Sequence, residues 1–144
     1  MTDPNEEILV NDEAATRAVG KSLATRLTPG DLVLLTGDLG SGKTVFVKGL
    51  AEGLGLTADD VASPTFALVH EYGDAEPPVL AHADFYRLLE AAEAEIRDLG
   101  LDDLLAAGTI VAIEWPRPPF TDRRAWHVAI ADLGGGARRI RLTS

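Results

Sequence analysis

The sequence contains no cysteine among its 144 residues. This absence excludes a disulfide-stapled fold, a zinc site or iron–sulfur cluster held by thiolates, and catalysis by a cysteine nucleophile. Hydrophobic residues make up 46% of the chain, which is ordinary for a globular protein, so a largely disordered chain is excluded as well. The length is typical of one domain, and we expect residues 1–144 to form a single domain.

Long apolar runs are also missing. No stretch approaches the ~20 consecutive apolar residues that a membrane-spanning helix needs. The first ten residues, MTDPNEEILV, are acidic and lack an apolar core behind a basic start, so they do not have the pattern of a signal peptide. We therefore expect a soluble, cytoplasmic protein that does not attach to a membrane.

Positive charge is scarce and unevenly distributed. The chain has 13 basic and 23 acidic residues, which gives a net charge of −10. Residues 1–114 carry 7 basic and 21 acidic side chains, whereas residues 115–144 carry six arginines and two aspartates. The excess of acidic side chains in residues 1–114 argues against independent binding of nucleic acid, whose phosphates attract basic surfaces. The basic C-terminal part is either a solvated strand face or a local contact for an anion.

Hydrophobic periodicity predicts a series of strands and helices. Uniformly apolar segments at 32–35 and 109–113 are typical of strands that are covered on both faces, as in a parallel sheet. The glycines at 134–136 predict a hairpin between strands 126–132 and 137–143. The other expected elements are strands at 6–10, 66–72 and 79–83, and helices at 12–27, 43–54 and 90–107, the last interrupted at Gly100. This order predicts an α/β sandwich with a mixed sheet.

One glycine-rich segment carries a specific chemical signal. The pattern G-x-x-x-x-G-K-[ST] is matched in full by Gly37-Asp38-Leu39-Gly40-Ser41-Gly42-Lys43-Thr44. In such a loop the glycines let the backbone wrap a phosphate, and the helix that follows directs the positive end of its dipole at the same anion. The ammonium of Lys43 would reach the β- and γ-phosphates, and the hydroxyl of Thr44 would bind a magnesium ion.

A phosphate-binding site of this kind also needs an acid at the end of a neighbouring buried strand. Two residues qualify, because Glu114 follows the apolar strand 110–113 and Asp84 follows the segment 79–83. The more uniform apolar strand favours Glu114, but either acid could instead cap a helix or pair with an arginine. Thr65, in Ser63-Pro64-Thr65, could sense the γ-phosphate, or the tripeptide could simply be a turn.

The sequence also indicates which nucleotide to expect. It contains no N-K-x-D element, which reads guanine in GTP-binding proteins, so ATP is the expected nucleotide. The segment between residues 56 and 108 contains only two arginines, Arg87 and Arg97. These are too few for the arginine-rich lid of small nucleotide kinases. His82 is expected to be packed or hydrogen-bonded within its strand rather than to act as a base.

Several of these segments form a family pattern. It consists of residues 37–44, Ser63-Pro64-Thr65-Phe66, Glu71-Tyr72, His82-Ala83-Asp84-Phe85-Tyr86-Arg87-Leu88 and Ile113-Glu114-Trp115-Pro116. Together they resemble the TsaE (YjeE) family, the small bacterial ATPases of tRNA threonylcarbamoyladenosine biosynthesis, over about residues 16–138. The resemblance implies one P-loop ATPase domain over residues 1–144. Its fold would be a P-loop NTPase-like three-layer α/β sandwich, with a mostly parallel central sheet and antiparallel flanking strands.

The resemblance further implies an activity and partners. The protein would bind ATP and Mg2+, hydrolyse ATP slowly when alone, and act together with the TsaB and TsaD proteins. TsaD would transfer the threonylcarbamoyl group to adenosine 37 of tRNA, and ATP hydrolysis would support repeated turnover of that complex. The tRNA would be met only indirectly, through the complex, which agrees with the acidic charge of the chain.

The family motifs imply a role for individual residues. Nucleotide binding falls to Asp38, Leu39, Gly40, Ser41, Gly42, Lys43, Thr44 and Arg138, metal binding to Thr44 and Glu114, and catalysis to Lys43, Asp84, Glu114 and Thr65. Within the catalytic set, Asp84 would be the acid needed for hydrolysis and Thr65 the switch threonine. Two other functions remain open at this point: a small-molecule phosphotransferase, and a non-catalytic, nucleotide-gated binding module.

Overall fold

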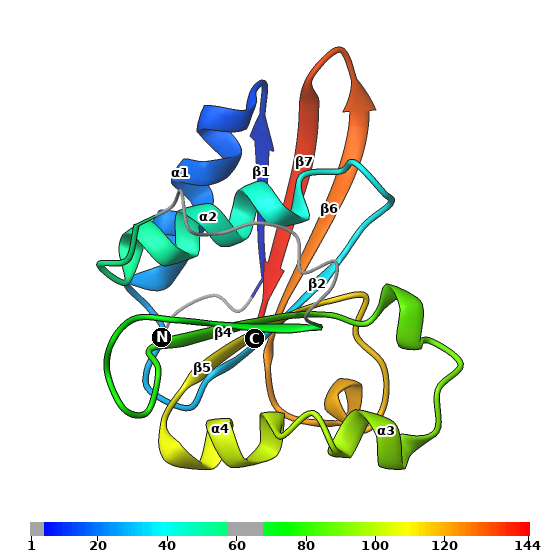
Figure 1. Ribbon diagram of the computed structural model, residues 1–144. Helices are drawn as coiled ribbons and strands as arrows, with labels where there is room; N and C mark the ends of the chain where they lie inside the picture. The colour runs from blue at the N-terminus through cyan, green and yellow to red at the C-terminus, as the bar shows by residue number, and fades with distance from the viewer. Residues whose placement is uncertain (1–4, 58–67) are drawn as a thin grey trace.

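A seven-stranded sheet forms the centre of the structure, a computed structural model that describes residues 5–57 and 68–144 (Figure 1). The strand order is β1-β7-β6-β2-β5-β4-β3. The central strands β6, β2, β5 and β4 pair in parallel, whereas the β1–β7, β7–β6 and β3–β4 pairs are antiparallel. The strands are β1 (Asn5–Val10), β2 (Leu32–Thr36), β3 (Val69–Tyr72), β4 (Leu80–Asp84), β5 (Ile110–Glu114), β6 (Trp126–Gly134) and β7 (Ala137–Thr143). The expected mixed sheet is thus confirmed.

Helices lie on both faces of the sheet. In Figure 1, α1 (Glu13–Ala24) and α2 (Lys43–Gly53) lie on one side, and α3 (Glu93–Arg97) and α4 (Leu101–Ala107) on the other. Strand β2 shows why both layers are needed, because its alternate side chains enter two different apolar cores. Val33 and Leu35 pack in the core beneath α1 and α2, and Leu32 and Leu34 in the core beneath α3 and α4.

In the part of the chain that the structure describes, strands β1, β7 and β6 contribute side chains to the core beneath α1 and α2 and none to the core beneath α3 and α4. Ile140 points into the core beneath α1, while the alternating residues Arg139 and Arg141 point to the opposite face. There the two guanidinium groups lie 3.9 and 3.5 Å from the carboxylate of Glu7 on the neighbouring strand. The expectation of a solvated strand face is confirmed for these two arginines.

Several element boundaries differ from the expected ones; the helical segment expected from residue 90, for example, begins at Glu93. Helix α1 ends at Ala24 rather than at residue 27, because the amides of Thr25, Arg26 and Leu27 bond to carbonyls three residues back, in a tightened last turn. Strand β3 begins at Val69, and residues 66 and 67 of the expected strand lie outside the described residues. The expected interruption at Gly100 separates α3 from α4. Within residues 5–57 and 68–144, no helix combines the length and apolar character that a membrane crossing requires.

Helices α1 and α2 approach each other closely because glycines face each other across the contact. A Cβ atom added at Gly49 of α2 would lie 2.0 Å from the carbonyl oxygen of Arg17 in α1. One added at Gly20 of α1 would lie 2.3 Å from the carbonyl oxygen of Phe46 in α2. Both clashes are with backbone atoms, so no side-chain rotation relieves them. This contact fixes the position of α2, and therefore of the loop that precedes it.

The close contact predicts an inverted effect of a glycine-to-alanine substitution. In an uncrowded helix, Gly49→Ala would stabilise the protein by about 1 kcal/mol. Here we expect the substitution to lower the free energy of unfolding by about 1–3 kcal/mol, because the helices must move apart. Urea unfolding monitored by circular dichroism measures this change. An increase in stability would show that the helices do not pack as closely as described.

Candidate functional site

Three parallel strands end at the glycine-rich segment, residues 37–44. Strand β2 leads directly into it, β5 ends at Glu114, and β4 ends at Asp84. The sheet register places Glu114 beside Leu35 of β2 on one side and beside Asp84 on the other. Ligands of α/β proteins commonly bind at the carboxyl ends of parallel strands. The strand order therefore brings together the predicted phosphate loop and both candidate acids.

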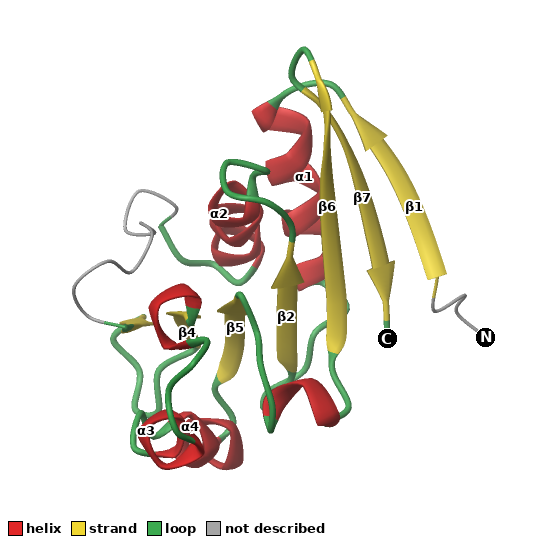
Figure 2. Cartoon of the chain, turned by 90° about the vertical axis from the view of Figure 1, so that its right-hand side faces the viewer, coloured by secondary structure: helices red, strands yellow, loops and turns green. Residues whose placement is uncertain are grey.

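A cavity of about 530 Å³ opens at this edge, a volume within the range of small-molecule sites. Figure 2 shows the loop that leads from β2 to α2 in this region, between α2 and the long strand β6. The cavity is lined by Leu39, Gly40, Ser41, Gly42, Lys43, Thr44, Val45, Asp84, Glu114, Trp115 and Arg138, and by Asn11, Asp12, Glu13, Thr16 and Gly136. It therefore contains nearly all of the residues that the sequence assigned to a nucleotide site.

Glu114 is the most constrained acid in the cavity wall. It is only 4% exposed, and its Oε2 accepts a hydrogen bond from the hydroxyl of Thr44 at 3.1 Å. The same oxygen lies 2.6 Å from Nε2 of His82, a fully buried residue of β4. Two donors thus converge on one carboxylate oxygen and fix its orientation. His82 is a hydrogen-bonded strand residue, as expected, and its Nδ1 has no hydrogen-bond partner within the described residues.

Asp84 is held differently. Its Oδ1 accepts a hydrogen bond of 2.9 Å from the backbone amide of Tyr86, two residues further along the chain. Partial burial raises the pKa of the Asp84 carboxyl, and the nearby charge of Glu114 raises it further, whereas the amide hydrogen bond lowers it. The spacing of the sequence left two candidate partners for Thr44, and the structure places Glu114 in contact with its hydroxyl.

Lys43 lies at the base of the cavity and is 5% exposed. Its ammonium donates hydrogen bonds to the carbonyl oxygens of Gly37 and Asp38, at 2.6 and 2.8 Å. It also lies 4.7 Å from the centre of the Trp115 ring, within the range of a cation–π contact. Burial lowers the pKa of the Lys43 amine, and neighbouring carboxylates, Glu114 above all, oppose this shift.

Trp115 stands in an unusual backbone conformation directly after Glu114. Its φ of 55° lies in the left-handed region, which costs a non-glycine residue about 1–3 kcal/mol. The indole packs edge-on against Tyr86, with 5.0 Å between the ring centroids. Strain of this kind persists only where the surroundings enforce it, and it is concentrated at functional sites. Here it places an aromatic ring over the ammonium of Lys43.

The backbone of the glycine-rich segment is shaped by close contacts. Gly37 has a φ of 150°, and a Cβ at this position would lie 2.5 Å from the carbonyl oxygen of Ile130 and 2.6 Å from Oγ of Ser41. The hydroxyl of Ser41 is buried and has no hydrogen-bond partner among the described residues. Helix α2 then begins at Lys43 with no side-chain cap and no acidic residue in its first turn. Its first amides therefore have no side-chain cap.

Helix α1 also begins at this cavity, but unlike α2 it has a side-chain cap. Its start is capped by Asp12, whose carboxylate accepts a hydrogen bond of 2.8 Å from the amide of Ala15, and Glu13 lies in its first turn. The positive end of this helix dipole already faces protein carboxylates. The start of α2 differs in having no side-chain cap, so its first amides are left for an external anion.

Three predicted site residues remain: Asp38, Arg138 and Thr65. Asp38 contributes its carbonyl to Lys43, and Arg138 reaches the segment from β7, where its Nε donates to the carbonyl oxygen of Ser41 at 2.8 Å. Thr65, the predicted switch threonine, lies outside the described residues.

The sequence reasoning missed the opposite wall of the cavity, which consists of Asn11, Asp12, Glu13, Thr16 and Gly136. Residues 11–13 carry the ordinary signal of a helix start, and nothing in that signal points to a ligand. Asp132, which bonds to Arg138, was also missed. A signal for it existed, because counting outward from the centre of the hairpin places residues 132 and 138 opposite each other.

Comparison with known proteins identifies relatives of this chain. The profile of the family described as "Threonylcarbamoyl adenosine biosynthesis protein TsaE" matches residues 10–140. A Bacillus subtilis protein named tRNA threonylcarbamoyladenosine biosynthesis protein TsaE is 47% identical over 106 residues, which cover 74% of this chain and 63% of that protein. A Nostoc protein of the same name is 36% identical over 98% of this chain and 87% of its own length. The crystal structure of Bacillus subtilis YdiB superposes with a TM-score of 0.74 at 30% identity, covering all of this chain and 88% of that one.

The raised pKa of Asp84 predicts a pH-dependent effect on stability. Because the folded state binds the proton more tightly than the unfolded state, ionised Asp84 destabilises the fold at neutral pH, and this cost disappears as the carboxyl becomes protonated. We expect Asp84→Asn to be more stable than the wild type at pH 7, with a gain that shrinks as the pH falls toward the ordinary aspartate value of 3.8. Urea unfolding at several pH values measures the difference. Asp74→Asn, in the exposed turn after β3, is the control, and an equal gain in both variants would contradict the assignment.

Proposed function

The chain belongs to the TsaE family, and from this premise we propose that it is an ATP-binding and ATP-hydrolysing accessory subunit in tRNA threonylcarbamoyladenosine biosynthesis. In this proposal residues 37–44 are a P-loop, and the sheet with its helices is a P-loop NTPase fold. The observation that carries the proposal is the hydrogen bond between Thr44 and the buried Glu114, beside Lys43 and the uncapped start of α2. In this proposal a phosphate-binding loop and a metal-binding pair would be adjacent, because Lys43, Thr44 and Glu114 line one cavity.

The residues present suit a nucleotide phosphate. The first turn of α2 offers amides without a side-chain cap, and the buried hydroxyl of Ser41 has no hydrogen-bond partner within the described residues. The ammonium of Lys43 would exchange the carbonyls of Gly37 and Asp38 for the phosphate oxygens. The start of α1, by contrast, is occupied by Asp12 and cannot serve in the same way.

The donor set also suits Mg2+. Within residues 5–57 and 68–144, no three His, Cys, Asp or Glu side chains gather into a metal site made by protein alone. Mg2+ in nucleotide sites is typically bound through one or two protein oxygens together with the phosphates, and Thr44 and Glu114 offer such oxygens. When bound, the ion would neutralise charge on the phosphates. His82 would keep the Glu114 carboxylate oriented toward this role.

Asp84 lies in the same cavity wall and is assigned to hydrolysis. Its raised pKa makes the carboxylate a better proton acceptor than an exposed aspartate, which suits a group that takes a proton from the attacking water. Arg138 is the only arginine among the described residues that line the cavity, and its guanidinium is already hydrogen-bonded to protein carbonyls. An arginine finger is worth ~10³–10⁵ in rate, so hydrolysis by the chain alone would be slow.

The partners would be the TsaB and TsaD proteins, with which this chain would act in the cytoplasm. TsaD would transfer the threonylcarbamoyl group to adenosine 37 of the tRNA, and ATP hydrolysis by this chain would restore the complex for another cycle. The net charge of −10 supports an arrangement in which the partners, rather than this chain, hold the tRNA.

Lys43→Ala tests the function directly. We expect this variant to lose ATP binding and to lower the rate of ATP hydrolysis by about 10²-fold or more, because the ammonium no longer stabilises the phosphates. It should also abolish multiple-turnover modification of tRNA by TsaB and TsaD, measured as threonylcarbamoyladenosine formed per TsaD. Lys48→Ala is the matched control, since Lys48 lies on the same helix but does not line this cavity.

The outcomes separate the proposed role from its alternatives. Product that stops near one equivalent without this chain, and continues with it, supports an accessory ATPase. If the chain binds ATP but leaves the modification unchanged, the tRNA role is wrong, and a search for a phosphorylated small-molecule product would follow. If ATP is bound but not cleaved even with both partners present, the chain is a nucleotide-gated binding module.

Two substitutions test whether Glu114 binds the metal and Asp84 serves hydrolysis. Glu114→Gln should raise the Mg2+ concentration needed for half-maximal ATP binding by about tenfold or more, because the ligand of the ion is lost. Asp84→Asn should leave that concentration nearly unchanged and should lower the hydrolysis rate. Titration of Mg2+ at fixed ATP, monitored by calorimetry, gives the first quantity, and phosphate release gives the second. The reverse pattern would assign the metal to Asp84.

A further inference from the structure

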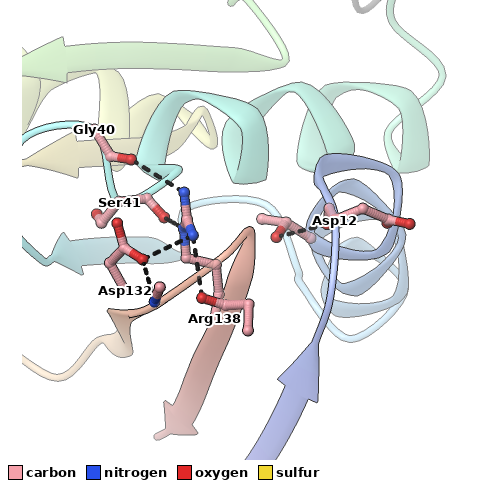
Figure 3. Close-up of polar contacts among 8 residues, drawn as sticks. Asp12, Gly40, Ser41, Asp132 and Arg138 are labelled. Atoms are coloured by element: carbon pink, nitrogen blue, oxygen red, sulfur yellow. Dashed lines mark hydrogen bonds and ion pairs between the residues drawn. The ribbon is translucent and has the colours of Figure 1, made fainter.

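The side chain of Arg138 crosses from strand β7 to the glycine-rich segment. Its Nε donates to the carbonyl oxygen of Ser41 at 2.8 Å, and Nη2 lies 3.5 Å from that of Gly40. Its Nη1 donates to Oδ1 of Asp132 at 3.0 Å and to the carbonyl oxygen of Ala137 at 3.1 Å. Figure 3 shows the guanidinium between the two carbonyls of the segment and the carboxylate of the hairpin. All of these partners are acceptors that belong to the protein.

Asp132 fixes the position of this arginine. The two residues lie directly opposite each other in the β6–β7 hairpin. Oδ1 of Asp132 also accepts a hydrogen bond of 2.8 Å from the amide of Gly134, at the irregularity in strand pairing where the hairpin turns. The carboxylate is therefore anchored to the turn, and it holds the guanidinium by a charge-assisted hydrogen bond.

The contact with Ser41 determines how one peptide group of the segment is oriented. In a trans peptide the carbonyl and the amide N–H point in opposite directions. Because the Ser41 carbonyl points to Arg138, the N–H of Gly42 in the same peptide points away from the guanidinium. Gly42 immediately precedes Lys43, where α2 begins, so this N–H belongs to the uncapped start of the helix.

Lys43 and Arg138 together occupy carbonyls at both ends of the segment. The ammonium binds those of Gly37 and Asp38, and the guanidinium binds that of Ser41. Lys43 is attached to the segment itself, whereas Arg138 comes from a different part of the sheet. If a bound phosphate drew the ammonium away from its carbonyls, the contact from Arg138 to Ser41 would remain as a support of the loop from another strand.

We propose that Arg138 is a positioning residue, which with Asp132 holds the Ser41–Gly42 peptide in the orientation that presents the Gly42 N–H to a nucleotide phosphate. It acts through the loop and does not touch the phosphate. This inference rests on the proposed function, since it requires that residues 37–44 bind a nucleotide. It differs from the direct contact between Arg138 and nucleotide that the family resemblance implied.

The test compares the affinities of ATP and ADP, each with Mg2+, for the wild type and five variants by isothermal titration calorimetry. Arg138→Ala should weaken both nucleotides by the same factor, on the order of tenfold to a hundredfold, since a charge-assisted contact to the loop is lost. Arg139→Ala, the next residue of the strand, points to the opposite face and should have no effect. A loss that is clearly larger for ATP than for ADP would mean direct contact with the γ-phosphate and would overturn the proposal.

Asp132→Ala gives the sharper result, because the two explanations predict opposite signs. If Arg138 contacts the phosphate, removal of a nearby negative charge frees the guanidinium and should strengthen nucleotide binding. If Arg138 supports the loop, removal of its anchor should weaken binding severalfold. In the Asp132→Ala/Arg138→Ala double variant, the aspartate substitution should then add little to the loss. Asp132 is half exposed, so its replacement by alanine should not prevent folding.

The controls separate failure of this inference from failure of the proposed function. Lys43→Ala should abolish binding while the wild type binds both nucleotides. If that holds and the Arg138 and Asp132 variants bind as well as the wild type, the positioning role is wrong and the nucleotide site stands. If the wild type binds neither nucleotide, both the proposed function and this inference are overturned.

Discussion

The buried carboxylate of Glu114 is the constraint on which the arrangement of the site depends. A carboxylate that is 4% exposed must be compensated by hydrogen bonds, because an isolated charge in a protein interior is costly. Thr44 and His82 provide this compensation from either side, one from the start of α2 and the other from the adjacent strand β4. The requirement to satisfy one oxygen thus ties the glycine-rich segment to the centre of the sheet, and the packing of α1 against α2 holds the other side of the helix in place.

The loop itself is held largely through its carbonyl oxygens. The amide of Ser41 donates to the carbonyl of Asp38 at 3.1 Å, and the amides at the start of α2 have no side-chain cap. Lys43 and Arg138 are both cations, and both are hydrogen-bonded to backbone carbonyls of residues 37–44. Cations that hold carbonyls on one side direct the corresponding amides to the other, which is the arrangement that favours an anion. The strained backbone of Trp115 fits the same picture, because it holds an aromatic ring against the lysine that would move when a phosphate binds. Strain and burial are concentrated around the place where the proposed chemistry occurs.

Much of this could be predicted from the sequence, and the limits have physical causes. Periodicity located α2 and the buried strands β2 and β5, because apolar spacing directly reflects which faces are covered. The more uniformly apolar strand before Glu114 favoured this residue, but spacing along the chain did not exclude Asp84, since both acids end apolar strands. The choice depends on the order β2-β5-β4, which places β5 next to the loop, and strand order is a tertiary property. The Asp132–Arg138 pair follows from the hairpin register, but the contact from Arg138 to Ser41 joins residues 97 positions apart, and no local pattern encodes it.

The most direct test of the central claim is an amide NMR titration of the protein with ATP and Mg2+. If ATP binds at residues 37–44 beside Thr44 and Glu114, the largest chemical-shift changes should occur in that segment, in the first turn of α2 and at Glu114 and Trp115. The exposed face of β1 and β7 should change little. Shift changes confined to another part of the sheet, with the amides of residues 37–44 unaffected, would contradict the assignment of this cavity to nucleotide.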